Sequence, residues 1–592
     1  MKKILDCIAQ AIMPAFTACG YDGSYARVTL SNRPDLCEYQ CNGAMAAAKT
    51  YKKKPIDIAA DVVKQVEESP QREMFSQITA VMPGFINIRL SEEYLAEYMN
   101  SMDREPKYGL EETGKGETVI VDYGGANVAK PLHVGHLRSA IIGESIKRLG
   151  RFLGYNMIGD VHLGDWGLQM GLIIEELRER KPDLPYFDDS WNGPYPDEAP
   201  FTISELEDIY PAASARSKED EDFKARAQEA TFRLQNGYEP FRAIWRHIMN
   251  VSLTDLKKNY GNLGVTFDLW KGESDAQEYI PGLIEDLRKK GLAYESQGAL
   301  VVDIAKETDS KELPPCIIRK SDGAALYATS DLGTILDREK KYAPSRYVYI
   351  TDKRQELHFI QVFRVAKMAG YVKEDTPMVH LMFGTMNGRD GKPFKTREGG
   401  VMRLESLMEE INGAVYDRIM ENRTVSCEEA RKTAGIIGLA ALKYGDLSNQ
   451  ASKDYVFDME RFISFEGNTG PYILYTIVRI KSILSRYNEM GGTLPPDATI
   501  LKAVSDGEKN LMLQLTKYRE AVENSFAETA PHKICQFIYE LSDVFNKFYN
   551  STMILKEENQ DRRTSYIKLI TLTKGVLETC IDLLGFEAPE RM

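Results

Sequence analysis

The chain has 592 residues, of which 43% are hydrophobic and 28% charged, a balance typical of globular proteins with several domains. Its formal net charge of -13 argues against promiscuous binding of nucleic acid through bulk electrostatics, although an acidic chain can still bind a structured RNA through local basic patches. No apolar run approaches the ~20 residues that a membrane span requires, so we expect no membrane association.

The amino terminus contains a short apolar segment, but we do not expect it to be a signal peptide. Ile4, Ile8 and Ile12 lie on one helix face, and Asp6 interrupts the apolar run. The eight cysteines are spread thinly and show no zinc spacing. These features predict a cytoplasmic protein with reduced thiols.

Residues 1–112 form the first predicted unit, a small α+β accessory domain. Its clearest strand is at 83–90, where apolar and polar residues alternate, and a helix is expected at 57–68. The segment 105–115, which is rich in proline, glycine and charge, is predicted to be a linker.

A strand, a loop and a helix are predicted next. The β-branched run ETVIVDY (117–123) indicates a buried strand, and apolar residues on helical spacing indicate a helix over 137–153. The loop between them, ANVAKPLHVGH (126–136), therefore follows the carboxyl end of a strand. In open α/β sheets nucleotides bind at this position.

The residue types in this loop suit a nucleoside triphosphate. His133 and His136 are three apart, so both imidazoles face one side of the first helical turn, where backbone N–H groups are unpaired. Gly135 lacks a Cβ, so a flat adenine ring can approach the backbone, and Lys130 adds a positive charge. Taken alone, the motif is equally consistent with an ordinary strand–helix junction that carries two surface histidines.

The next segment favours the nucleotide-binding interpretation. HLGDWG (162–167) follows a second predicted strand at 156–161 and precedes a helix at 170–180, which is the start of a doubly wound sheet. NVAKPLHVGHLRSAIIGESIKRLGRFLGY, followed by GDWGLQMG, resembles class I arginyl-tRNA synthetases, with HVGH as their form of the HIGH motif. The resemblance extends over nearly the whole chain, and the later motifs occur in family order.

This resemblance implies a multidomain α/β fold with a Rossmann-like, doubly wound parallel-sheet core over residues 116–460. It also implies that the domain at 1–112 contacts the elbow of tRNA, with Phe85 and Asn87 of the GFIN strand as candidate contacts. Residues 181 to about 300, with a long acidic helical stretch at 205–260, resemble the connective insertion of class I synthetases. The insertion is too compact for an editing domain, and a site of paired charges should not need one.

The core resumes with residues that suit a guanidinium group, which is planar, permanently charged and carries five donors. Tyr327 and Asp331 are four apart and share a helix face, while the predicted strand YVYIT (347–351) leads to Gln355. Each alone is better explained as a packing tyrosine, a helix cap or a loop glutamine. The resemblance implies that the arginine pocket is lined by Asp122, Asn127, Tyr327, Asp331 and Gln355.

Residues 387–400 are dense in glycine and charge, which is typical of a solvated loop. The loop follows an apolar strand predicted at 378–386, where the family carries the KMSKS loop that closes on the triphosphate. PFKTR departs from that pattern, because Thr396 stands in place of the second lysine, and Lys130 is expected to substitute. The candidate ATP-binding residues of this loop are Lys392, Lys395, Thr396 and Arg397.

The remaining residues, 461–592, are predicted to be mainly helical, with helices near 472–486, 508–523 and 565–584. From the pattern alone, a helical bundle for dimerisation would explain them. The segment 441–470 resembles the family's junction between core and carboxyl-terminal domain, so the resemblance implies an anticodon-binding bundle. The last residue, Met592, is then a candidate tRNA contact.

The activity implied by the resemblance is that of an arginyl-tRNA synthetase. ATP and L-arginine would form arginyl-adenylate and pyrophosphate, and arginine would pass to the terminal adenosine of tRNA(Arg). His133, His136 and Lys130 would stabilise charge on the phosphoryl oxygens, with ATP over Gly135. We expect Mg²⁺ to arrive with ATP, without a dedicated protein metal site, and the protein to be a monomer.

Two other classes of protein fit the sequence less well. A catalytically silent paralogue could bind tRNA or arginine, but every catalytic position named above holds a usable residue. A nicotinamide-dependent dehydrogenase is disfavoured, because no GxGxxG follows the first core strand, where GGAN (124–127) stands instead.

Overall fold

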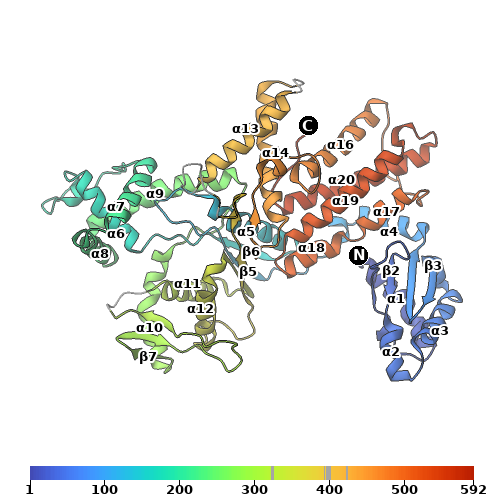
Figure 1. Cartoon of the computed structure of the whole chain (residues 1–592), viewed down its shortest axis with the longest axis horizontal. Helices are drawn as coiled ribbons and strands as arrows, with labels where there is room; N and C mark the ends of the chain where they lie inside the picture. The colour runs from blue at the N-terminus through green and yellow to red at the C-terminus, as the bar shows by residue number, and fades with distance from the viewer. Residues whose placement is uncertain (322–325, 393, 395–401, 422–424) are drawn as a thin grey trace.

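A computed structural model of the protein describes residues 1–321, 326–392, 394, 402–421 and 425–592. It confirms the predicted fold class: an α+β unit is followed by a Rossmann-like parallel-sheet core with an insertion, and then by a helical bundle (Figure 1). No helix within these ranges is long and apolar enough to cross a membrane.

The amino-terminal unit is an antiparallel sheet packed against helices. Its strands, β1 (Val28–Leu30), β2 (Tyr39–Cys41), β3 (Phe75–Val81) and β4 (Phe85–Leu90), lie in the order β1-β2-β4-β3. Its helices are α1 (Ile4–Ala18), α2 (Gly43–Tyr51), α3 (Pro55–Glu67) and α4 (Glu92–Arg104). Strand β4 lies within the predicted strand, and its buried residues alternate with half-exposed ones.

The core is a four-stranded parallel sheet in the order β11-β10-β5-β6. These strands are β5 (Thr118–Asp122), β6 (Asn156–Asp160), β10 (Arg346–Asp352) and β11 (Met378–Phe383). The first strand of the core, β5, pairs with β6 on one side and with β10 on the other. Strand order therefore reverses beside β5, and this switch point opens a crevice at the carboxyl ends of β5 and β10.

Helices cover both faces of this sheet, as a parallel sheet requires. Val119 and Val121 join the hydrophobic cluster that includes α5 (Val134–Phe152). Ile120, which points the other way, joins a second cluster with α11 (Tyr327–Tyr342) and α12 (Glu356–Met368). The alternation of neighbouring residues along β5 thus separates the two layers of the core.

The insertion between the two halves of the core begins with helices. After α6 (Leu168–Arg180) come α7 (Ile203–Arg216), α8 (Glu221–Gln235) and α9 (Glu239–Asn262), and then α10 (Ile280–Lys289) and the sheet β7-β8-β9 (Ala293–Ser296, Ala299–Val302, Cys316–Arg319). The helical stretch predicted at 205–260 is three helices, because Asp220 caps a new helix and Gly237 adopts a positive φ of 84°.

The carboxyl-terminal part is a helical bundle that contacts both other parts. It contains α16 (Gly470–Glu489), α17 (Asp506–Leu515), α18 (Tyr518–Ala527), α19 (His532–Ser551) and α20 (Gln560–Leu583), and follows α13 (Leu404–Glu421) and α14 (Cys427–Leu447). The single helix predicted at 508–523 is wrong: α17 ends at Leu515, and α18 starts anew at Tyr518. Asn100 of α4 exchanges two hydrogen bonds of 2.8 Å with the backbone of Ile500, which ties the bundle to the amino-terminal unit.

A buried ion pair fixes α5 against the helices that follow the core. Arg138, 1% exposed, donates to Asp446 of α14 at 2.9 Å and to the carbonyl oxygens of Gly384 and Lys453 at 2.8 and 3.0 Å. The Tyr455 hydroxyl donates to the same carboxylate at 2.8 Å. Removing one partner from such a pair leaves a buried charge without compensation.

The substitution Asp446→Ala should therefore lower the free energy of unfolding by about 3 kcal/mol. Urea or thermal denaturation would measure the loss. Asp35→Ala is a matched control, because it breaks the Arg33–Asp35 pair, whose side chains are 67% and 57% exposed, and should change stability little. Equal effects of the two substitutions would contradict an anchoring role for Arg138.

Candidate active site

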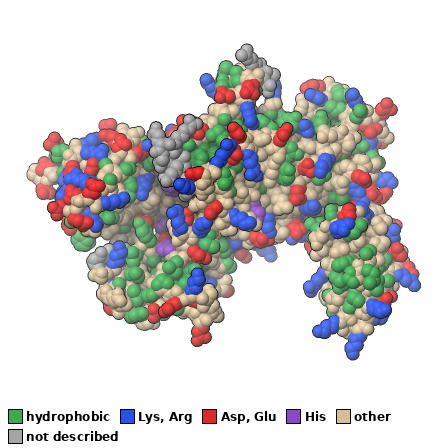
Figure 2. Space-filling view, in the orientation of Figure 1, with side chains coloured by type: hydrophobic (Ala, Val, Ile, Leu, Met, Phe, Trp, Pro, Cys, Tyr) green, Lys and Arg blue, Asp and Glu red, His purple; other side chains and the backbone are tan. Residues whose placement is uncertain are grey.

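The residues predicted to bind substrates gather around the crevice at the ends of β5 and β10. Figure 2 shows histidine side chains in the hollow between the α6–α8 lobe and the lobe of α10–α12. The loop from β5 to α5 supplies one wall. The backbone N–H of Val134 in this loop donates to Met402 at 3.1 Å, and Leu404 donates to Leu132 at 3.0 Å. The HVGH segment is thus bonded to the chain that directly follows the predicted KMSKS-like loop.

His133 and His136 cap the first turn of α5 with their own side chains. Nδ1 of His133 accepts from the Gly135 N–H at 3.0 Å, and Nδ1 of His136 accepts from the His133 N–H at 3.2 Å. The two rings lie 4.0 Å apart between centroids. Serine, threonine and aspartate usually cap helices in this way, so the imidazoles take over a structural task.

Burial determines the protonation state of both rings, and the capping hydrogen bonds determine which nitrogen carries the proton. Burial lowers the pKa of His136 to about 3, with a smaller contribution from His133, and burial followed by Lys130 lowers that of His133. Both imidazoles are therefore neutral at pH 7, and since each Nδ1 accepts a hydrogen bond, each Nε2 carries the proton. Among the described residues neither Nε2–H has an acceptor, so both can donate to a phosphate oxygen.

Gly135 and Lys130 shape the surroundings of the two rings. A Cβ on Gly135 would lie 2.7 Å from Cε1 of His133, so any side chain there would displace that imidazole. Nζ of Lys130 lies 4.4 Å from the centroid of the Tyr210 ring on α7. The lysine is thus held by a cation–π contact beside the histidines and does not contact them. Of the loop candidates, Lys392 lies in a tight turn, its N–H donating to Asp390 at 3.0 Å, whereas Lys395, Thr396 and Arg397 lie outside the described residues.

Asp331 is the centre of the predicted arginine pocket. Its two carboxylate oxygens contact Nε2 of His358 at 2.5 Å and Nε2 of His162 at 3.4 Å. Burial alone would raise the pKa of Asp331, but the two imidazoles outweigh it and hold the pKa well below its usual range. Burial likewise disfavours a charged His162, yet Asp331 and Asp122 raise its pKa to about 9. Asp331 and His162 thus form a partly buried ion pair at the pocket.

Asp122 is already engaged by the protein's own guanidinium. Arg338, 1% exposed, donates to Asp122 at 2.6 Å and to Asp160 at 2.8 Å. Burial raises the pKa of Asp122, and Arg338 and then His162 oppose that rise. Asp122 therefore orients Arg338 and adds to the field at His162. Neither Arg338 nor this arrangement was foreseen from the sequence, since a lone arginine in the middle of α11 carries no local signal.

The other pocket candidates lie on chain segments that lead to or follow residues of the Asp331 centre. Asn127 forms a parallel β-bridge with Gly164. Tyr327, at the start of α11, is 69% exposed, and Gln355, which follows β10, is also exposed. Glu273, which the sequence did not single out, adds a further carboxyl group to this site. Burial raises its pKa to about 7, with smaller effects of His162, Asp165 and Asp331. The charge of Glu273 also raises the pKa of Tyr327, after burial.

Candidate tRNA contacts lie far from this crevice along the chain. Phe85 and Asn87 lie on β4, where Asn87 accepts from Gln40 at 2.9 Å, and Met592 is 39% exposed. A cluster on α16 and α19 was missed by sequence reasoning. The Arg479 guanidinium lies 4.6 Å from the Tyr475 ring and 5.0 Å from the Tyr549 ring, and Tyr475 is 40% exposed. Such an aromatic and basic surface suits unpaired bases.

Comparison with known proteins matches all three parts of the chain. The family described as "tRNA synthetases class I (R), catalytic domain" matches residues 99–459, the "Arginyl tRNA synthetase N terminal domain" matches 2–90 and the "DALR anticodon binding domain" matches 473–592. Relatives from Agathobacter rectalis and Alkaliphilus oremlandii, each named arginine–tRNA ligase, are 60% and 55% identical over 100% of both chains.

Two solved structures have a similar fold. Arginyl-tRNA synthetase from Plasmodium falciparum superposes with a TM-score of 0.81 at 24% identity, and that of Thermus thermophilus with 0.78 at 22% identity. Each comparison covers 100% of both chains.

The substitution Asp331→Asn should lower the pKa of His162 from about 9, because the hydrogen bond to the carboxylate and its charge are lost and only Asp122 remains to oppose burial. NMR titration of the histidine rings would measure this. The pKa of His162 is higher in the folded protein than in the unfolded chain, so its positive charge stabilises the fold. This stabilisation is complete below pH 6.5 and is lost as the pH rises through about 9. His247, bonded to Tyr186 at 2.8 Å, should titrate unchanged in the variant. An unshifted His162 would show that Asp331 does not hold its proton.

Proposed function

The chain belongs to the class I arginyl-tRNA synthetases, and from this premise we propose how its own residues carry out the reaction. The enzyme activates arginine with ATP, forming arginyl-adenylate and pyrophosphate, and transfers arginine to tRNA. The observation that carries the residue assignment is the pair of neutral imidazoles at the start of α5, together with the partly buried Asp331–His162 pair.

Charge on the phosphoryl oxygens would be stabilised by His133 and His136. Their Nε2–H groups are fixed in direction because both Nδ1 atoms are held by the backbone of the same turn. Donors that need no reorganisation during the reaction stabilise a transition state more than donors that must first be aligned. The adenine ring would lie over the exposed Gly135, with Lys130 adding positive charge after release from Tyr210.

The guanidinium of arginine would bind at Asp331. Each of its carboxylate oxygens meets one imidazole, which leaves lone pairs free for forked hydrogen bonds. Tyr327, Gln355 and Asn127 supply neutral acceptors at the rim. Glu273 adds a second carboxyl group, and a bound cation would favour its ionised form, since its pKa of about 7 leaves it partly protonated.

The remaining assignments concern the polyanionic substrates. We propose that Mg²⁺ arrives with ATP and that Lys392, Lys395, Thr396 and Arg397 help to neutralise pyrophosphate. The tRNA elbow would lie on the amino-terminal unit near Phe85 and Asn87. Lys and Arg side chains gather at the outer end of this unit (Figure 2). The anticodon would stack near Tyr475 and Arg479, with the chain end at Met592. We further propose that the enzyme is a cytoplasmic monomer.

Aminoacylation of unfractionated tRNA with each labelled amino acid tests the reaction directly. We expect charging with arginine alone. Intact tRNA binding without charging would mean that the motifs persist on a silent scaffold, and charging with another amino acid would overturn the assignment of the Asp331 pocket.

The substitution His136→Ala should lower kcat of arginine-dependent pyrophosphate exchange by about 10²–10³-fold, because it removes one prealigned donor. The KM for ATP should change by less than about threefold, since the donor acts mainly on charge that develops in the transition state. Steady-state kinetics would separate the two quantities. Parallel losses in kcat and ATP affinity would count against a transition-state role for His136.

A further inference from the structure

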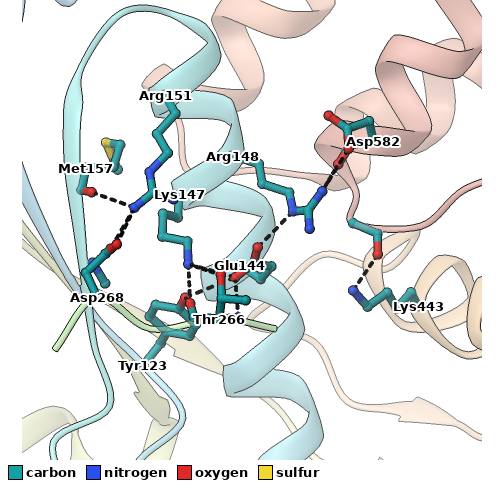
Figure 3. A network of polar contacts seen from close by, with 12 residues as sticks. Tyr123, Glu144, Lys147, Arg148, Arg151, Met157, Thr266, Asp268, Lys443 and Asp582 are labelled. Atoms are coloured by element: carbon teal, nitrogen blue, oxygen red, sulfur yellow. Dashed lines mark hydrogen bonds and ion pairs between the residues drawn. The ribbon is translucent and has the colours of Figure 1, made fainter. Parts of the chain in front are cut away.

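The carboxyl-terminal half of α5 carries charged residues that face the end of α20 on one side and the segment 266–268 on the other (Figure 3). Glu144, 2% exposed, is their centre. Its carboxylate accepts from Tyr123 at 3.2 Å, from the Thr266 N–H at 3.1 Å, and from Lys147 and Arg148 at 2.9 and 2.8 Å. A buried carboxylate with four donors is fully compensated only while every donor stays in place.

One side of this network reaches the end of the carboxyl-terminal bundle. Arg148 donates to Asp582, at 2.8 Å to the carboxylate and at 3.1 Å to the carbonyl. Ser145 donates to a carbonyl of the last turn of α20 at 3.0 Å, and Lys443 of α14 donates to Gly585 at 2.6 Å. Gly585 has a positive φ of 83°, which other residues rarely adopt, and a Cβ there would lie 2.7 Å from Nζ of Lys443, so a side chain at this position would displace that lysine.

The other side reaches a wall of the crevice. Arg151 contacts both carboxylate oxygens of Asp268 at 2.7 Å, and Asp268 also accepts from the Gly159 N–H at 2.8 Å. Further along the same segment, the Glu273 N–H donates to Leu163 at 3.0 Å, which places Glu273 beside His162. The segment from Thr266 to Glu273 is thus held by α5 at one end and lines the crevice at the other.

We propose that Arg148 and Glu144 are positioning residues for the reaction: through them, docking of the bundle at Asp582 fixes both the helix that carries His133 and His136 and the segment that carries Glu273. Neither residue touches substrate. Displacement of α20 would remove Asp582 from Arg148, and the freed guanidinium could turn away from Glu144. The buried carboxylate would then recruit water or shift α5. Binding energy from tRNA on the bundle therefore acts on the geometry of the crevice.

Arg148→Ala tests the proposal, with Arg148→Lys as the conservative variant and Lys574→Ala as the matched control. Lys574 pairs with Glu578 at 3.0 Å within α20 and does not reach α5. We expect Arg148→Ala to lower kcat of aminoacylation about tenfold while the KM for tRNA changes less than about threefold. Arg148→Lys should recover part of kcat, and Lys574→Ala should match the wild type.

Asp582→Ala provides a second variant that should fold normally, because the Asp582 side chain is 74% exposed. This substitution should also lower kcat, but by a smaller factor than Arg148→Ala, because Arg148 keeps its hydrogen bond to the carbonyl oxygen of residue 582. An unchanged kcat in Arg148→Ala would overturn the proposal. So would equal losses of kcat in Arg148→Ala and Lys574→Ala that accompany equal falls in Tm, because the loss would then reflect stability alone. The inference rests on the proposed roles of His133, His136 and Glu273, and charging by the wild type tests the reaction separately.

Discussion

Helix α5 is held in place by buried charge as well as by apolar packing, and the active-site geometry depends on this. Its first turn carries the two imidazoles, Arg138 in the next turn pairs with Asp446, and Glu144 and Lys147 follow on the buried side. Hydrophobic contacts tolerate small rotations of a helix, whereas charge-assisted hydrogen bonds are directional. The helix is therefore restricted in rotation and translation at three levels along its length.

The crevice contains histidines in opposite protonation states. His133 and His136 are kept neutral because no carboxylate among the described residues compensates their burial, while His162 is kept charged because Asp331 and Asp122 face it. A neutral ring next to phosphates can donate from Nε2 in a fixed tautomer. A charged ring next to Asp331 keeps that carboxylate ionised, which suits the guanidinium that we propose it binds. Neighbouring charge, and not residue type, assigns the two tasks.

An acidic protein can still bind tRNA because its charges are unevenly distributed. The net charge is -13, yet Lys52, Lys53 and Lys54 are exposed together between α2 and α3, and Arg479 lies between two tyrosines on the bundle. Local patches of this kind select a shaped polyanion, and the acidic remainder disfavours indiscriminate contacts.

Much of this protein could be predicted from its sequence because the determining signals are local. The β-branched run in 117–123, the HVGH loop before a helical pattern and the resemblance over nearly the whole chain led to the fold class and to the family. Periodicity cannot find a break that leaves the apolar stripe intact, so α17 and α18 were predicted as one helix. Tertiary structure alone decided which charges meet: Arg338 binds Asp122, Asp331 keeps His162 protonated, and Arg148 reaches Asp582. Those partners lie far apart in the chain, and the field at a buried group depends on distances through space that no local pattern contains.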